Sequence, residues 1–411
     1  MVSPSPLAPA AFPALPPIPG VALASAHCGI RYKERRDLMV ALLDPGTTIA
    51  GVFTRSKTRG APVDWCRAAL KRGKVRAIVV NSGNSNTFTG RAGKEVVERT
   101  AAAMAKIAGC DPREVYISST GVIGEPPPAD KIVGALPAAA RTARSDATAW
   151  REAAEAILTT DTFAKGTTRS VPIDGVTVTI NGFCKGSGMI APDMATMLAY
   201  LFTDAALPAG VLQQLLSAGN ERSFNSITVD GDTSTSDTVL LCATGKARHR
   251  RVSRADDPRL KDFRRALDEV MIDLAQQIVR DGEGAEKFVT IAVRGAASAR
   301  AARRIGLAIG NSPLVKTALA AGDANWGRIV MAVGKAGEKA DRDRLAIAVG
   351  GIRIAENGGP VPDYDEAPVS EHMKGREIMI AVDLGIGRGK ATVWTCDLTH
   401  GYIDINGSYR S

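Results

Sequence analysis

The stretch that decides the fold is KGSGMIAPDMATML, from Lys185 to Leu198. Glycines and a proline lead into an apolar run, and Thr196 stands at the junction. A turn of this kind can hold strain at one peptide bond, and the small residue Ala195 leaves its carbonyl open to attack. Cutting the Ala195–Thr196 bond would place the threonine hydroxyl beside a new α-amine, a base suited to neutral pH. The stretch therefore predicts a precursor that cleaves itself before Thr196.

Strand-like and helical segments surround this stretch without the strict alternation of a doubly wound parallel fold. Apolar or alternating runs predict strands, and apolar residues three or four positions apart predict helices. The mixture favours an α+β architecture built in layers. The expected strands are residues 76–80, 114–119, 176–180, 197–202, 238–243, 288–293, 345–349, 378–382 and 391–396. The expected helices are residues 95–108, 145–158 (with Ser145 or Asp146 as the cap) and 260–278.

Composition sets bounds on the function. The chain has 411 residues, 45% of them hydrophobic and only 5% aromatic, so it can bury a large aliphatic core in two or more lobes. The formal net charge of +9 is dispersed and accompanies no nucleic-acid-binding module, which favours solvated surface charge. The six cysteines form no CxxC pair and the four histidines lack ligand spacing. We therefore expect no metal site, no disulfide framework, and reduced thiols in the cytoplasm.

The N-terminus is rich in proline. The run MVSPSPLAPAAFPALPPIPG contains seven prolines in 20 residues, which would block the helical core of a signal peptide. We expect residues 1–24 to form a disordered lead-in. The α chain would then comprise residues 25–195, and the β chain residues 196–411. No apolar run of about 18 residues occurs in the chain, so we expect no membrane span.

Acyl transfer also requires donors for the oxyanion that develops on the attacked carbonyl. The run SSTGVIG, residues 118–124, follows a predicted strand and offers the Thr120 hydroxyl and an unhindered N–H at Gly121. Such a run is more often an ordinary turn, so both interpretations stay open at this point. The loop NSGNSNTFTG, residues 81–90, is a second polar segment at a strand end, where active sites commonly lie.

Together these segments carry a family resemblance. KGSGMIAPDMATML resembles the cleavage signature of the ornithine acetyltransferase family, the bifunctional glutamate N-acetyltransferases of arginine biosynthesis. Further blocks follow in the family's order from about residue 25 to the last residue, which makes the resemblance specific. These blocks are NSGNSNTFTG, SSTGVIG, TTDT (159–162), SFNSITVDGDTSTSDT (223–238), DGEGAEKF (281–288), NSPLVKTALAAGDANWGRI (311–329) and INGSYRS (405–411).

The resemblance implies a fold and an activity. It implies an α+β fold: a layered αββα-type sandwich with a second, smaller lobe, formed by a self-processed precursor. Such enzymes move an acetyl group from N-acetylornithine to the nucleophilic threonine and then to glutamate. Some members also accept acetyl-CoA as donor, and no other cofactor is expected. The resemblance further implies an α2β2 heterotetramer in the cytoplasm, with no nucleic-acid or membrane partner.

The motifs assign roles to individual residues. Thr196 would be the nucleophile, with Thr120 and Gly121 as the oxyanion hole. The substrate would contact Thr162, Lys185, Thr196, Glu283, Asn406 and Ser411, and no residue would bind metal.

Each assignment has a plainer alternative. Lys185 could pair with a substrate carboxylate or be an ordinary loop lysine. Glu283 could hold the ornithine amine or be a turn carboxylate. Three threonines compete within TTDT, and the tail that would close the site could instead fray. Asp193 and Asp232 could be structural turn formers.

The chain departs from the family pattern at several positions, which bears on donor preference more than on reaction type. Serine replaces a common alanine at position 85, and Ser236 replaces a common asparagine. The remaining departures are Thr87 and Phe88 in the first polar loop, Ala324 for proline, and Ser411 for threonine.

Two other functions remain open from the sequence. A self-processing aminopeptidase or amidohydrolase would keep the nucleophile but pass the acyl group to water; transfer instead demands a second substrate held in place. A basic nucleic-acid or anion-binding protein without catalysis would rest only on the net charge, which lacks a stacking platform.

Overall fold

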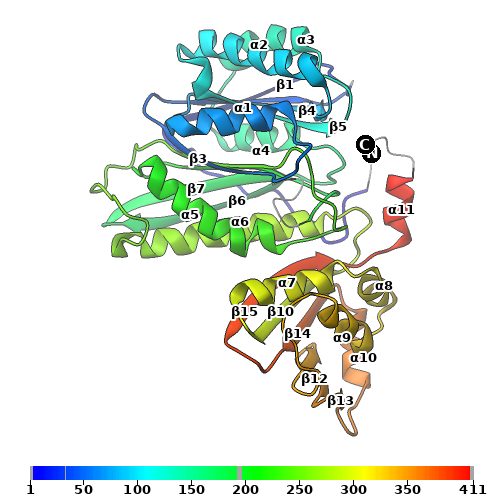
Figure 1. The fold of residues 1–411 in the computed structure, drawn as a ribbon. Helices are drawn as coiled ribbons and strands as arrows, with labels where there is room; N and C mark the ends of the chain where they lie inside the picture. Colours follow the sequence, from blue (N-terminus) through cyan, green and yellow to red (C-terminus); the bar gives the residue numbers. More distant parts are fainter. Residues whose placement is uncertain (1–2, 33, 192–196, 408–411) are drawn as a thin grey trace.

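Two β-sheets stacked between helices form the larger lobe (Figure 1). The structure is a computed structural model that describes residues 3–32, 34–191 and 197–407. The first sheet, sheet A, has the strand order β1-β2-β4-β5, antiparallel except for the parallel pair of β4 and β5. Its strands are β1 (Val21–Ala26), β2 (Leu38–Leu43), β4 (Ala77–Asn84) and β5 (Val115–Val122).

The second sheet, sheet B, contains the first and last residues of the stretch KGSGMIAPDMATML, because β7 ends at Lys185 and β8 begins at Leu198. Its order is β3-β9-β8-β7-β6, and only β8 and β9 run parallel. Every residue of β8 is buried, as expected of an apolar central strand. The strands are β3 (Thr48–Phe53), β6 (Lys165–Ile173), β7 (Val176–Lys185), β8 (Leu198–Thr203) and β9 (Thr238–Ala243).

Helices cover the outer faces of both sheets, which confirms the expected layered α+β sandwich, but α1 and α4 also lie between the sheets, a layer that the expected αββα order lacks. One core joins α2 and α3 to sheet A, another joins α5 and α6 to sheet B, and a third lies between the sheets with α1 and α4. The helices are α1 (Ala61–Ala69), α2 (Gly90–Ala108), α3 (Ala129–Arg141), α4 (Ala147–Ala156), α5 (Ala209–Arg222) and α6 (Lys261–Arg280). Short 3₁₀ turns are η1 (Leu70–Arg72), η2 (Pro112–Glu114), η3 (Phe224–Ser226) and η4 (Pro258–Leu260).

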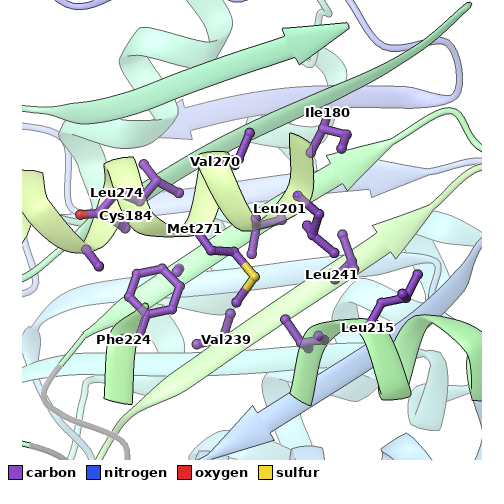
Figure 2. Packing of buried hydrophobic residues seen from close by; sticks show 14 of the residues in the cluster. Ile180, Cys184, Leu201, Leu215, Phe224, Val239, Leu241, Val270, Met271 and Leu274 are labelled. Carbon is purple, nitrogen blue, oxygen red and sulfur yellow. The ribbon is translucent and has the colours of Figure 1, made fainter. Parts of the chain in front are cut away.

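The helix predicted over residues 260–278 is α6, and its apolar stripe packs on sheet B. Figure 2 shows Val270, Met271 and Leu274 facing the sheet residues Leu201 and Leu241, all of them buried. Burying a side chain of this size contributes about 1.5–3 kcal/mol. This packing fixes the position of the turn that follows α6, which carries DGEG.

A smaller lobe follows α6 and has its own core, as expected (Figure 1). Its sheet, sheet C, has the order β13-β12-β11-β14-β10-β15. The strands are β10 (Phe288–Ala296), β11 (Ala346–Val349), β12 (Ile352–Glu356), β13 (Gly359–Pro360), β14 (Glu377–Asp383) and β15 (Gly389–Cys396). The helices are α7 (Ala299–Gly310), α8 (Pro313–Ala321), α9 (Trp326–Gly334), α10 (Ala367–Lys374) and α11 (His400–Asn406). None of the described helices has both the length and the apolar character needed to cross a bilayer.

The proline-rich lead-in corrects one expectation: its described part is packed, not disordered. Leu15 and Ile18 are fully buried in the core between the sheets. The Asn181 amide donates to the carbonyl of Pro16 at 2.7 Å, and β1 already begins at Val21. The physical reason is that prolines keep the segment extended while the apolar residues between them still gain free energy by burial.

Candidate active site

A cavity of about 90 Å³ gathers five of the residues singled out from the sequence, namely Thr120, Gly121, Lys185, Glu283 and Asn406. They come from segments spread over most of the chain, so only the fold brings them together. The full lining is Ser85, Thr120, Gly121, Ile123, Thr159, Thr160, Lys185, Gly188, Met189, Ser234, Thr235, Ser236, Glu283 and Asn406.

The two oxyanion-hole candidates lie at the end of β5, where it runs beside β4. Thr120 is 3% exposed, and Gly121 pairs with Gly83 in the parallel register. Gly121 has a φ of +126°, and a Cβ there would lie 2.3 Å from the carbonyl carbon of Gly83. Only glycine fits such a close approach of two strands. The residue type at position 121 is therefore dictated by the backbone that borders the cavity.

Lys185 brings a buried cation to the cavity at the end of β7. Its Nζ donates to Thr159 Oγ1 at 2.9 Å, and the residue is 4% exposed. Burial lowers the pKa of Lys185, although the carboxylate of Asp161 opposes the shift. No carboxylate of the described residues lies within ion-pair distance of this ammonium. The arrangement can therefore bind an anionic group in the cavity.

Glu283 and Asn406 line the cavity together and are hydrogen-bonded to each other. Asn406, the last residue of α11, donates from Nδ2 to Glu283 Oε2 at 2.8 Å. The Glu283 carboxylate also packs over Gly188, where a Cβ would lie 2.3 Å from Oε2. The helix α11 is held on the DGEG turn by Thr399, whose hydroxyl donates to Gly284 O at 2.6 Å. This part of the C-terminal tail is docked at the cavity, while Ser411 lies outside the described residues.

Among the TTDT threonines, the structure brings two unassigned residues to the cavity. Thr159 and Thr160 line it, whereas Thr162 does not. The Thr162 hydroxyl instead donates to Asp281 Oδ1 at 2.5 Å and accepts the N–H of Ser5 at 2.8 Å. The choice between these three threonines depends on which side chains turn toward the cavity, and a tetrapeptide carries no signal for that.

The predicted cleavage site, Ala195–Thr196, lies outside the described residues, as does Asp193. The chain on either side of it is anchored by carboxylates. The N–H groups of Met189 and Ile190 donate to Asp230 at 2.6 and 2.9 Å. On the C-terminal side of the cleavage site, the Met197 N–H donates to Asp237 Oδ1 at 3.0 Å. Both ends of the segment that carries Thr196 are therefore fixed next to the cavity lining.

Met189 lines the cavity with a backbone conformation that is uncommon for a residue with a side chain, since its φ is +56°. Asp232 lies in a turn closed by the Asp230 carboxylate, since the Asp232 N–H donates to Asp230 Oδ1 at 3.2 Å. This bond closes the turn that presents the Asp230 carboxylate to the loop.

Asp237 is a residue that sequence reasoning missed. It is fully buried, and this burial raises the pKa of its carboxyl well above the ordinary range. Its Oδ2 has no hydrogen-bond partner among the described residues. The sequence did contain one indication of Asp237, because this residue directly follows Ser234–Ser236 in the block SFNSITVDGDTSTSDT, and those three residues line the cavity.

Two positions at which the chain departs from the family pattern, Ser85 and Ser236, also line the cavity.

The fold and the cavity define the class of protein. It is an α+β enzyme whose polar site is bordered by a buried cation (Lys185), a carboxylate (Glu283) and a strand end that contains Gly121. The sequence pattern of the ArgJ family matches residues 22–411. The chain is 58% identical over 413 residues to the arginine biosynthesis bifunctional protein ArgJ of Gluconobacter oxydans, covering 100% of this chain and 97% of the relative. It is 56% identical over 410 residues to the ArgJ protein of Bradyrhizobium diazoefficiens, covering 99% of each.

The chain belongs to the ArgJ family and is an acyltransferase of arginine biosynthesis, which confirms the resemblance seen in its motifs. Two solved structures are similar in sequence. The ArgJ protein of Bacillus halodurans is 40% identical, with a TM-score of 0.49, over 50% of this chain and 96% of that one. The ornithine acetyltransferase of Mycobacterium tuberculosis, solved with ornithine, is 31% identical, with a TM-score of 0.37, over 47% of this chain and 96% of that one.

Proposed function

We propose that this enzyme transfers the acetyl group of N-acetylornithine to glutamate through an acetyl-Thr196 intermediate, giving ornithine and N-acetylglutamate. Thr196 would become available by self-cleavage of the Ala195–Thr196 bond. The observation that carries the proposal is the gathering of five motif residues around one cavity, beside both anchored ends of the segment that contains Thr196. Family membership supports the same reaction class.

The chemistry proceeds in two acyl transfers. In the first, the Thr196 hydroxyl attacks the acetyl carbonyl while the α-amine of Thr196 takes its proton. The hydroxyl of Thr120 and the N–H of Gly121 would stabilise the oxyanion. The C–N bond then breaks, and the leaving ornithine amine receives the proton. In the second transfer, the neutral amine of glutamate attacks the ester carbonyl and gives one proton to the α-amine of Thr196. The ester C–O bond then breaks, the α-amine returns the proton to the Thr196 oxygen, and N-acetylglutamate leaves.

The cavity residues would hold the substrate between opposite charges. The Lys185 ammonium suits an α-carboxylate, and the Glu283 carboxylate suits the cationic amine of ornithine. Asn406 would orient Glu283, since it already donates to that carboxylate. Glutamate also carries an α-carboxylate, so the two substrates could use the same lysine in turn.

Several finer features belong to the proposal. The enzyme would act as a glutamate N-acetyltransferase and, if acetyl-CoA is also a donor, as an amino-acid N-acetyltransferase. It would need no metal or other cofactor. The α and β chains would remain together in an α2β2 heterotetramer in the cytoplasm.

One experiment tests the reaction and its donor. Purified protein is incubated with glutamate and either N-acetylornithine or acetyl-CoA, and N-acetylglutamate and free acetate are measured. We expect N-acetylglutamate with N-acetylornithine, and little free acetate. Acetate without N-acetylglutamate would overturn the proposal in favour of hydrolysis. Product formation with acetyl-CoA decides whether the enzyme catalyses both reactions.

A further inference from the structure

A fully buried lysine is bonded to the segments that carry cavity residues and has no role in the mechanism so far. Lys165 is 0% exposed at the start of β6. Its Nζ donates to Asp161 Oδ1 at 2.7 Å and to Asp281 Oδ2 at 2.5 Å. A third bond goes to the carbonyl of Phe163 at 3.2 Å. The ammonium is therefore satisfied by two buried carboxylates and one carbonyl.

The two carboxylates hold the three segments that carry cavity residues. Asp161 accepts the N–H of Gly186 at 2.6 Å and the N–H of Thr159 at 3.0 Å. Asp281 accepts the N–H of Thr162 at 2.9 Å, and its carbonyl accepts the hydroxyl of Ser187 at 2.6 Å. The TTDT, KGSG and DGEG segments thus meet at one charged cluster.

The charges of this cluster also act on the cavity lysine. Burial alone would raise the pKa of Asp161, but Lys165 and then Lys185 outweigh it and lower that pKa. Burial raises the pKa of Asp281 despite the opposing charge of Lys165. Lys185 experiences attraction from Asp161 and repulsion from Lys165. Without Lys165, Asp161 would be a buried carboxylate whose nearest remaining cation is Lys185.

We propose that Lys165 is a positioning residue that sets substrate specificity: by pairing with both Asp161 and Asp281, it draws Asp161 away from Lys185 and leaves the Lys185 ammonium available for the α-carboxylate of the substrate. The inference rests on the proposed function. It explains why Lys185 has no ion-pair partner among the described residues although two carboxylates lie in the neighbouring segments. Removing Lys165 would let Asp161 compete with the substrate for Lys185, because an uncompensated buried charge is costly.

The test compares two donor substrates in the full-length enzyme. KM is measured for N-acetylornithine and for its α-carboxamide, which lacks the carboxylate, and is extrapolated to saturating glutamate because the acceptor would use the same lysine. In Lys165→Met we expect KM for N-acetylornithine to rise about tenfold or more, the scale of a lost charge-assisted hydrogen bond. KM for the carboxamide should stay within about twofold, because it never used the Lys185 charge. Equal changes for both donors, or no change for either, would overturn the proposal.

A double variant separates charge balance from structural damage. Lys165→Met with Asp161→Asn removes one carboxylate together with the lysine, so the net charge of the cluster stays as in the wild type. We expect this variant to prefer N-acetylornithine over the carboxamide as the wild type does, even if the single variant does not fold. A folded double variant without that preference would refute the proposal.

Two controls complete the experiment. The matched control is Lys374→Met, which removes an exposed lysine paired with Glu371 and should leave both KM values unchanged. A wild-type enzyme that forms no N-acetylglutamate at all would instead indicate failure of the proposed function, so the two failures are distinguishable.

Discussion

Replacing Gly121 with alanine tests the oxyanion hole most sharply. The new Cβ would lie 2.3 Å from the carbonyl carbon of Gly83 and 2.8 Å from the nitrogen of Asn84, against an ordinary contact of 3.4 Å or more. The end of β5 must therefore move by about 1 Å, a misplacement that can cost about 100-fold in rate. That factor equals about 2.7 kcal/mol of transition-state stabilisation. The unfavourable φ adds about 1–3 kcal/mol of strain to the folded state.

The assay measures kcat/KM for acetyl transfer together with the free energy of unfolding in urea. Gly124→Ala is the matched control, because Gly124 also has a positive φ, of +90°, but has nothing within 4 Å of the new Cβ. We expect Gly121→Ala to lose about 100-fold in kcat/KM, and Gly124→Ala to lose about 1–3 kcal/mol of stability from its own positive φ at nearly full activity. Wild-type kcat/KM in Gly121→Ala, or an equal loss in both variants, would refute the reasoning.

Two further predictions concern the charged groups near the cavity. Because burial lowers the pKa of Lys185, its charge is lost as the pH rises through a value below the usual lysine range. We therefore expect kcat/KM for N-acetylornithine to fall in that pH range. Lys185→Arg should move the fall to higher pH, because arginine keeps its charge. An unchanged alkaline limb in the arginine variant would contradict the carboxylate-binding role. At Asp237, alanine would leave the Met197 N–H without its acceptor, at a cost of about 1–3 kcal/mol, whereas asparagine keeps an oxygen. Self-cleavage followed on denaturing gels should slow in Asp237→Ala and proceed nearly normally in Asp237→Asn; equal rates in both variants would show that this hydrogen bond does not matter.

Features encoded locally could be predicted from the sequence. The apolar run that became β8 and the stripe that became α6 are each contained in one continuous segment, so periodicity was enough. The cap of the helix over residues 147–156 is Asp146, one of the two candidates. Motif order also indicated which segments would supply the cavity, and five of the assigned residues line it.

Features that depend on distant contacts could not be predicted. The ion pair of Lys165 with Asp281 joins residues separated by 116 positions, and neither residue belongs to a local pattern that announces the other. The lead-in illustrates the same limit, because its prolines suggested disorder while the burial of Leu15 and Ile18 depends on a groove formed by later segments. Which TTDT threonine reaches the cavity is likewise decided by the hydrogen bonds of Thr162 to Asp281 and Ser5.

The most direct test of the central claim is intact-mass analysis of the purified protein before and after brief incubation with N-acetylornithine alone. The account predicts two chains that separate between Ala195 and Thr196. It also predicts that the β chain alone gains the mass of one acetyl group, which glutamate then removes. An active protein that remains a single uncut chain, or an acetyl group carried by the α chain, would contradict the account.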